Sequence, residues 1–250
     1  MSGHLMRAAL DAAERGWHVF PLRPGTKRPA LHGERTCTRT GPCAGGHLKW
    51  EQRATTDPDR IRATWSAAPF NVGIATGPSG LVVVDLDVPK DNSSGDAPCG
   101  AATFQALCER AGHAVPTTYR VRTASGGQHL YFAAPSGVRL ANTARTVAAS
   151  VDTRAWGGYV VAAGSTTPTG PYEALCGPET VPVPGWLLSI LRPAPKPSQA
   201  PSVAVAGQSR RYADVALANE ARNVARSAYG GREAALFRAA RALGRFVAWG

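Results

Sequence analysis

Long apolar stretches and acidic residues are scarce in this 250-residue chain. No apolar run approaches the roughly 20 residues needed to span a bilayer, so the sequence argues against a membrane-spanning protein. The N-terminus, MSGHLMRAALDAAERG, has neither the continuous apolar core nor the cleavage site of a secretory signal, and its pattern predicts a short amphipathic helix. We therefore expect a soluble, cytoplasmic protein.

Disulfide bonds are not expected either. Five cysteines in a chain without an export signal argue against a disulfide framework. Cys99, Cys108 and Cys176 are scattered along the chain and are interpreted as loop or core residues. Cys37 and Cys43 lie close to two histidines and are treated separately below.

The shortage of acidic residues leaves the chain strongly basic. It has 17 acidic residues against 28 lysines and arginines, and a formal net charge of +11. Such an excess favours an acidic polymer as partner, most often a nucleic acid. The alternative is a bias of a GC-rich genome, because only four of the 28 are lysine and the chain is rich in Ala, Gly and Pro. The excess is uneven, since residues 207–250 hold eight arginines and three acidic residues.

The order of the expected elements indicates an α+β fold. The 27 glycines and 20 prolines favour turns and loops over a helix bundle. Apolar patterns and turn residues predict a meander-like sheet, with 71–76 and 81–87 joined as a hairpin by the turn GPSG. Helices are expected at 5–15, 58–67 (with Asp57 as N-cap), 101–111 and near the end of 180–192, and strands at 18–22, 71–76, 81–87, 118–123, 128–134, 150–154 and 158–164.

Three regions are expected along the chain. Residues 1–195 form the α+β domain, and the Pro/Ala-rich stretch at 196–210 is typical of a linker. Residues 211–250 form a basic helical segment, which we expect to be cut short at Gly250 because no C-cap or tail follows. In its last helix, apolar residues recur at helical spacing near one face: Leu236, Phe237, Ala240, Leu243 and Val247.

The stretch LVVVDLDV at 81–88 combines four apolar residues with two aspartates. The apolar run predicts a strand buried on both faces. Side chains at i and i+2 of a strand point to the same side, so Asp85 and Asp87 are expected to be neighbours. Aspartates also end strands simply as turn residues. With a third carboxylate, such as Asp152 on another strand, the pair would make a cradle for Mg²⁺ or Mn²⁺.

A second group of polar residues lies between these aspartates in sequence. Ser125, Gly126 and Gly127 form a turn whose backbone amides can approach a ligand, and His129 follows at the start of a strand. A lone histidine is more often structural than catalytic. Arg154 shares a strand face with Asp152, and Arg120 and Arg122 share another, as phosphate-binding guanidiniums would.

Together these motifs resemble the bifunctional DNA primase/polymerase (Prim-Pol) domain of the archaeo-eukaryotic primase superfamily. They are VVVDLD at 82–87, SGGQHLYF at 125–132 and VDTRAWGGYVVAAGS at 151–165, and VFPLRPGTKRPAL resembles that family's opening loop with Lys27. The resemblance covers about residues 5–192. The C-terminal piece GGREAALFRAARALGRFVAWG resembles the helical segment after such domains in actinobacterial mobile-element proteins, of plasmid or phage.

The resemblance implies a catalytic sheet related to the RNA-recognition motif, with an N-terminal α/β unit beside it. It implies Asp85, Asp87 and Asp152 as ligands of two Mg²⁺ or Mn²⁺ ions, and His129 with Ser125, Gly126 and Gly127 as the site of the incoming triphosphate. Arg154 and Lys27 are implied as helpers on phosphate or template. The implied activity is primer synthesis or DNA extension from dNTPs or NTPs on single-stranded DNA, with a replicative helicase, in the same chain or another, as a candidate partner.

The stretch HGERTCTRTGPCAGGH predicts a candidate zinc site. It places His32, Cys37, Cys43 and His47 within a loop that has no core of its own, and these four ligand types suit tetrahedral Zn²⁺. The spacing is looser than the common C-x2-C form. A flexible loop with two free thiols is the alternative.

Two other functions use the same residues. A metal-dependent nuclease or an RNA-only nucleotidyltransferase would use the same metal ligands. Release of pyrophosphate from dNTPs would distinguish a DNA polymerase from both. A non-catalytic replication initiator would bind DNA with a vestigial acidic cluster. The intact set of Asp85, Asp87, His129 and Asp152 argues against the initiator, because decay would break the set.

Overall fold

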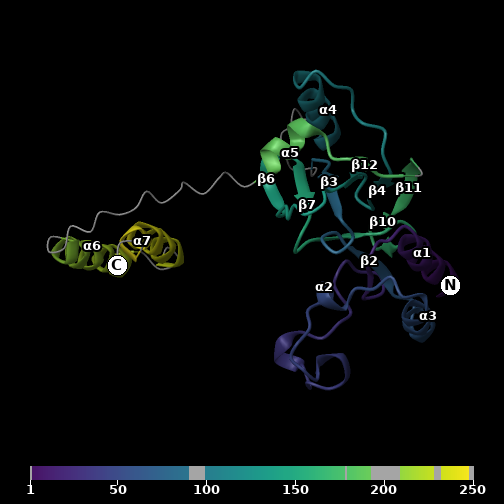
Figure 1. Cartoon of the computed structure of the whole chain (residues 1–250), viewed down its shortest axis with the longest axis horizontal. Helices are drawn as coiled ribbons and strands as arrows, with labels where there is room; N and C mark the ends of the chain where they lie inside the picture. Colours follow the sequence, from purple (N-terminus) through teal and green to yellow (C-terminus); the bar gives the residue numbers. More distant parts are fainter. Residues whose placement is uncertain (1, 90–98, 178, 193–208, 228–231, 248–250) are drawn as a thin grey trace. The chain divides into compact units, whose positions relative to one another are not determined.

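The computed structural model describes residues 2–89, 99–177, 179–192, 209–227 and 232–247 (Figure 1). The chain divides into two compact units, Met1–Pro193 and Ala194–Gly250. Most of the linker expected at 196–210 lies outside the described residues. Within the described ranges, the helices are too short or too polar to cross a bilayer.

A mixed sheet centred on β3 forms the main part of the first unit. All neighbours in its main path pair antiparallel, and the short β12 (Val181–Pro182) adds to β5 in parallel. The strand order across the sheet is β11 (Glu173–Cys176), β4 (Arg120–Arg122), β5 (Gln128–Ala133), β3 (Leu81–Leu86), β7 (Val151–Arg154) and β6 (Thr143–Ala148). The predicted α+β class is confirmed.

Two details of the expected topology are wrong. The strands flanking the turn at 77–80 do not form a hairpin. Strand β2 (Asn71–Ala75) pairs with β1 (Val19–Leu22) and β8 (Tyr159–Val161) in a separate sheet, whereas β3 pairs with β5 and β7. The sheet is not a meander either, since β3 lies between two strands that come later in the chain. The apolar run of β3 explains this central position, because only a strand covered on both faces buries four such residues in succession.

The second sheet has the order β1 (Val19–Leu22), β2 and β8 (Tyr159–Val161). It packs with α1 (Ser2–Glu14) and α3 (Pro58–Ala67). Helix α3 begins as predicted, because the Asp57 side chain accepts hydrogen bonds from the backbone N–H groups of Asp59 and Arg60 and Pro58 occupies the first turn. The strands β9 (Thr166–Thr167) and β10 (Gly170–Pro171) form a separate short hairpin.

Two apolar cores lie on opposite faces of the larger sheet. Val82 and Val84 of β3 belong to a core with α4 (Gly100–Arg110) and α5 (Gly185–Leu191). Val83 belongs to the other core, which contains α1 and the second sheet. The alternation of β3 therefore turns Asp85 toward the side of the second sheet.

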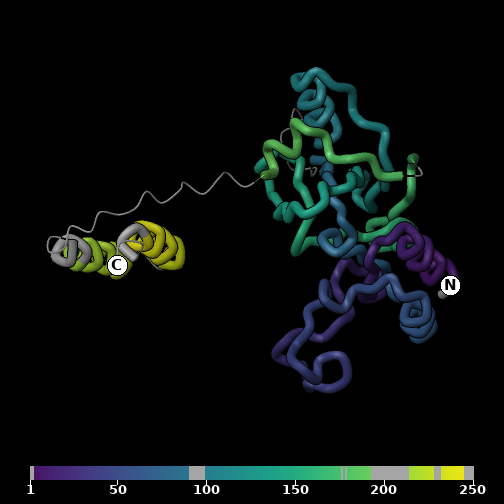
Figure 2. Tube along the Cα trace, viewed as in Figure 1, coloured from purple at the N-terminus to yellow at the C-terminus, as the bar shows by residue number. Residues whose placement is uncertain are grey.

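Between β1 and α3 the chain makes a long excursion with little regular structure. It contains two 3-10 turns, Glu34–Thr36 and Gly41–Cys43, and the short helix α2 (Trp50–Arg53). Figure 2 shows this segment extending from the rest of the first unit. The four-residue helix α2 ends this irregular segment.

The second unit contains α6 (Ser209–Ala225) and α7 (Arg232–Val247), which contact each other. Ala235 and Ala239 of α7 are buried, whereas Leu236 and Phe237 are 60% and 66% exposed. Among the side chains described in α7, the buried ones are therefore small. The larger apolar residues expected near one face are only partly covered within the described segment.

Candidate active site

The central position of β3 brings three polar residues together. In the antiparallel registers, Asp85 lies opposite His129 of β5 on one side and opposite Asp152 of β7 on the other. Directly opposed residues of antiparallel strands project to the same face of the sheet. The three side chains, separated by 67 residues of sequence, therefore share one short row across the sheet.

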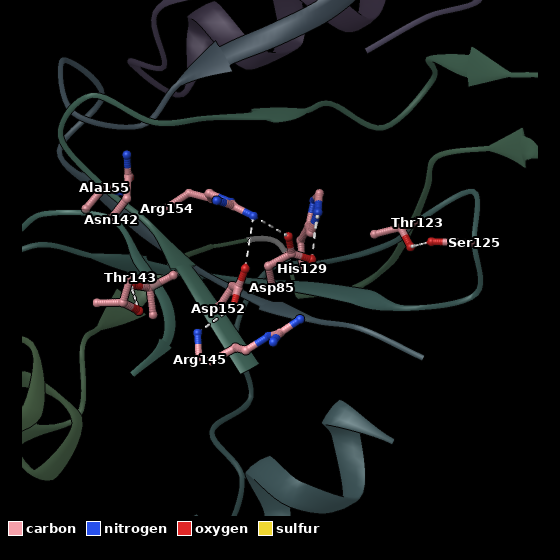
Figure 3. Close-up of polar contacts among 11 residues, drawn as sticks. Asp85, Thr123, Ser125, His129, Asn142, Thr143, Arg145, Asp152, Arg154 and Ala155 are labelled. Atoms are coloured by element: carbon pink, nitrogen blue, oxygen red, sulfur yellow. Dashed lines mark hydrogen bonds and ion pairs between the residues drawn. The ribbon is translucent and has the colours of Figure 1, made fainter. Parts of the chain in front are cut away.

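Arg154 lies beside the row, two residues after Asp152 on β7. One of its terminal nitrogens is 3.5 Å from Asp85 Oδ2 and 3.3 Å from Asp152 Oδ2 (Figure 3). On the other side, His129 Nε2 is 3.4 Å from Asp85 Oδ1. The cation that lies between two carboxylates in this structure is thus a guanidinium, and it bridges Asp85 to Asp152.

The two aspartates of the D-x-D pair have opposite shifts in pKa. Burial alone would raise the pKa of Asp85, but the hydrogen bond and charge of His129 and the charge of Arg154 hold it below its ordinary value. The pKa of Asp87 is raised, by partial burial and by the negative charges of Asp85 and Asp152. The negative charges of Asp85 and Asp152 thus disfavour the ionised form of Asp87, which is exposed just beyond the end of β3.

Asp152 is held in place by the backbone of the neighbouring strand. The N–H of Arg145 on β6 donates to Asp152 Oδ1 at 2.9 Å. Arg145 has a φ of 55°, in the left-handed region, where the β6–β7 ladder is irregular. With Oδ1 held in this way, the other carboxylate oxygen of Asp152, Oδ2, accepts a hydrogen bond from Arg154.

A cavity of about 350 Å³ opens at this face of the sheet. Its walls include Asp85 and His129 from the larger sheet and Tyr159 from the second one. The other residues that line it are Lys27, Asn142, Arg154, Gly157, Gly158, Val160, Val161 and Tyr172. Four of the predicted site residues, Lys27, Asp85, His129 and Arg154, therefore line one pocket between two sheets.

The predicted phosphate turn lies beside the row but does not line this cavity. Ser125, Gly126 and Gly127 connect β4 to β5, and the Ser125 hydroxyl is 3.2 Å from that of Thr123 (Figure 3). A Cβ at Gly127 would overlap the carbonyl oxygen of Leu86, the last residue of β3. Glycine is required there because the turn packs against the backbone just before Asp87.

Arg120 and Arg122 do not face the acidic row or the predicted triphosphate site. They share one face of β4 as expected, but the residue opposite His129 is Val121, so both arginines project to the other face. Arg122 pairs with Glu173 at 2.6 Å, and Arg120 donates to the carbonyl oxygen of Pro116. The register of β4 against β5 determines which face the two arginines occupy, and this register cannot be read from the sequence pattern.

Sequence reasoning missed several residues around the pocket. Asn142 accepts a hydrogen bond from the backbone of Ala155, and Glu51 accepts one from the N–H of Gly157 at 2.9 Å. Tyr159 and Tyr172 line the cavity. No periodicity marks these positions. Only the glycine pair within AWGGY signals that other groups approach that turn closely, and a Cβ at Gly158 would overlap Asn142.

The four residues of the predicted zinc site converge. One ligand atom from each of His32, Cys37, Cys43 and His47 lies within 4.8 Å of the others. Cys43 Sγ is buried and 3.5 Å from His32 Nε2, and Nδ1 of His47 is buried without a hydrogen-bond partner among the described residues. Two thiols and two imidazoles at such distances fit a tetrahedral metal site.

Comparison with known proteins agrees with this geometry. The sequence profile of the family described as "Bifunctional DNA primase/polymerase, N-terminal" (Prim-Pol) matches residues 9–199, which contain the acidic row, the pocket and the Cys/His cluster. A search of curated proteins found no match. The profile covers most of the chain, and the chain belongs to the Prim-Pol family.

Proposed function

We propose that the chain is a template-dependent nucleotidyltransferase that makes primers or extends DNA on a single-stranded template. The observation that supports this best is the row in which Asp85 lies opposite both His129 and Asp152, beside a pocket of about 350 Å³. Family membership adds the primase/polymerase activity that is typical of Prim-Pol enzymes.

The carboxylates fit a pair of hard divalent cations. Asp85, Asp87 and Asp152 bring three carboxylates together, and Arg154 and His129 offset their charge in the structure. Oxygen ligands of this kind are those preferred by Mg²⁺ and Mn²⁺. When bound, such ions activate the primer 3′-hydroxyl and stabilise the charge of the triphosphate and of the pyrophosphate that leaves. We assign all three aspartates as ligands.

The remaining polar groups around the pocket suit an incoming nucleotide. His129 is an N–H donor beside the acidic row, and Lys27 and Arg154 place positive charge on the pocket wall. We propose that His129 holds the triphosphate and that Lys27 and Arg154 assist. Arg154 now contacts the carboxylates of Asp85 and Asp152, and from its place on the pocket wall it would contact phosphate if those carboxylates were engaged by a bound cation. For Ser125, Gly126 and Gly127, the triphosphate role stays a prediction from the family resemblance.

We further propose that His32, Cys37, Cys43 and His47 hold one structural Zn²⁺. Four protein ligands close the coordination shell, so this ion would have no open position for catalysis. Its contribution would be to order a loop that otherwise contains almost no buried residue.

Primer synthesis tests the proposed function. The protein is incubated with single-stranded DNA, labelled dNTP or NTP, and Mn²⁺, and the products are separated by length. We expect labelled products and released pyrophosphate, and neither with Asp85→Asn. Shortening of the DNA without incorporation would instead indicate a nuclease, and DNA binding without any turnover would indicate an initiator. This assay does not test the predictions of a helicase partner and of a mobile-element source.

A further inference from the structure

The loop that carries the Cys/His cluster is also the most basic segment of the first unit. Residues 23–49 contain one acidic residue, Glu34, and six basic ones: Arg23, Lys27, Arg28, Arg35, Arg39 and Lys49. All six are exposed. Within the described residues, none of them forms an ion pair with an acidic side chain. The segment therefore presents a concentrated positive charge that the protein itself leaves uncompensated.

Both ends of this loop are attached to the wall of the pocket. At the first end, the Tyr159 hydroxyl donates to the carbonyl oxygen of Lys27 at 2.9 Å. At the second end, Glu51 of α2 accepts from the N–H of Gly157 at 2.9 Å. Trp50, next to Glu51, packs against the ring of Tyr159 with the ring centres 5.0 Å apart.

These attachments fix where the charge lies. Tyr159 and Gly157 line the pocket, and so does the Lys27 side chain. The basic residues consequently begin at the mouth of the nucleotide pocket and continue outward along the excursion seen in Figure 2. Charge with this placement suits a long polyanion that reaches the pocket, and it exceeds what one triphosphate needs.

We propose that the exposed basic residues of 23–49 form a binding surface for the phosphate backbone of a nucleic-acid single strand. Arg23, Arg28, Arg35, Arg39 and Lys49 contact successive phosphates of the strand that enters the pocket. The proposal rests on the proposed function in identifying that strand as the template. Recognition is by backbone charge and therefore independent of sequence.

Salt-dependent binding tests the surface without catalysis. Affinity for a labelled oligothymidylate is measured by fluorescence anisotropy at several salt concentrations, with no nucleotide and no divalent cation, for the full chain and for Arg35→Gln/Arg39→Gln. Each phosphate contact on single-stranded DNA contributes about 0.7 to the slope of log K against log salt. Loss of two contacts should flatten the slope by about 1.4 and weaken binding about 25-fold at 0.1 M salt.

A matched control removes equal charge elsewhere. Arg110→Gln/Arg192→Gln changes two exposed arginines at the ends of α4 and α5, the helices on the opposite face of the sheet. Its slope should stay at the wild-type value. A second loop variant, Arg28→Gln/Lys49→Gln, guards against local misfolding at Arg39, where φ is 54°, and melting temperatures are compared for all variants.

The outcomes separate this inference from the proposed function. Equal slopes for both loop variants and the wild type overturn the surface, even if the protein polymerises DNA. If the loop and control variants lose the same amount of affinity and slope, the proposed surface is also overturned, because the loss is then a general effect of net charge. A flattened slope in the loop variants alone supports the surface, even if no nucleotide is incorporated and the proposed function fails.

Discussion

Replacing Asp87 by asparagine is expected to stabilise the metal-free protein while abolishing its activity. Asp87 is largely exposed beyond the end of β3, and its remaining partial burial together with the negative charges of Asp85 and Asp152 raises the pKa of its carboxyl. A raised pKa means that the folded state disfavours the charged form. Asparagine keeps the shape of the side chain and removes the repulsion.

The expected gain is small because solvent screens exposed charges. Interactions of this kind are worth about 0.2–1 kcal/mol. For a folded unit of this size, 1 kcal/mol corresponds to about 2–4 °C, so the melting temperature should rise by about 0.4–4 °C in EDTA at pH 7. The direction of the change in melting temperature is informative. The chain carries a net charge of +11, so removing a negative charge elsewhere would add to the general repulsion and lower the melting temperature.

The pH dependence follows from the direction of the shift. Above its folded pKa, the ionised Asp87 lowers the stability of the wild type, and below its unfolded pKa it has no such effect. The difference in melting temperature between Asp87→Asn and the wild type should therefore be full at neutral pH. It should vanish as the pH falls below the ordinary value of 3.8 for this carboxyl.

Divalent cations should reverse the order of stability. A ligand at 100 times its Kd stabilises a protein by about 2.7 kcal/mol, which is about 5–11 °C here. Mn²⁺ should raise the melting temperature of the wild type by such an amount, and that of Asp87→Asn by much less. Incorporation of nucleotide by the variant should fall about a thousandfold or more, because several kcal/mol of charge stabilisation are lost.

The control is Asp59→Asn, which removes one carboxylate from α3, where Asp59 pairs with Arg62 at 2.9 Å. Its melting temperature should stay level or fall slightly, and its response to Mn²⁺ should match the wild type. The reasoning is refuted if Asp87→Asn melts below the wild type in EDTA at pH 7. It is equally refuted if Mn²⁺ stabilises both proteins to the same extent.

Three further predictions concern other parts of the first unit. His129→Ala should lower kcat/KM for nucleotide about ten- to a hundredfold, because a charge-assisted hydrogen bond is lost, and should leave the affinity for single-stranded DNA unchanged. If nucleotide incorporation, DNA binding and the melting temperature all fall together, the histidine is structural instead. Glu51→Ala should raise the KM for nucleotide about fivefold by releasing Gly157, whereas Glu51→Gln keeps an acceptor and should behave as wild type; equal kinetics for both variants would exclude this positioning role. Elemental analysis of protein never exposed to chelator should find about one zinc per chain, and Cys43→Ser should carry much less; a wild type without zinc would contradict the site.

Local signals account well for the elements themselves. The apolar run at 81–84 predicted a strand buried on both faces, and β3 is that strand. Asp57 and Pro58 predicted the start of α3, because a side-chain cap and a proline act within a few residues of themselves. Short strands such as β6 and β11 were missed, since neither has an apolar alternation that distinguishes it from a loop.

The identity of the candidate site also came largely from sequence, through the order of the motifs around Asp85, His129 and Asp152. Their chemistry limits what they can bind, so the expectation of metal and phosphate needed no coordinates. The same holds for the Cys/His loop, where four ligand types in a short segment indicate a metal. Residue type and local spacing therefore determined which residues to consider.

Only the tertiary structure decided which of them meet. Strand register is set by turns and by packing far along the chain, so the sequence left open that Val121, and not Arg120, lies opposite His129. The second sheet supplies β8 to the wall of the pocket, and the Glu51–Gly157 bond joins the basic loop to that wall. The position of Arg154 between Asp85 and Asp152 follows likewise from the pairing of β3 with β7. Each of these is a contact between residues distant in sequence, and such contacts leave no periodic or local pattern to read.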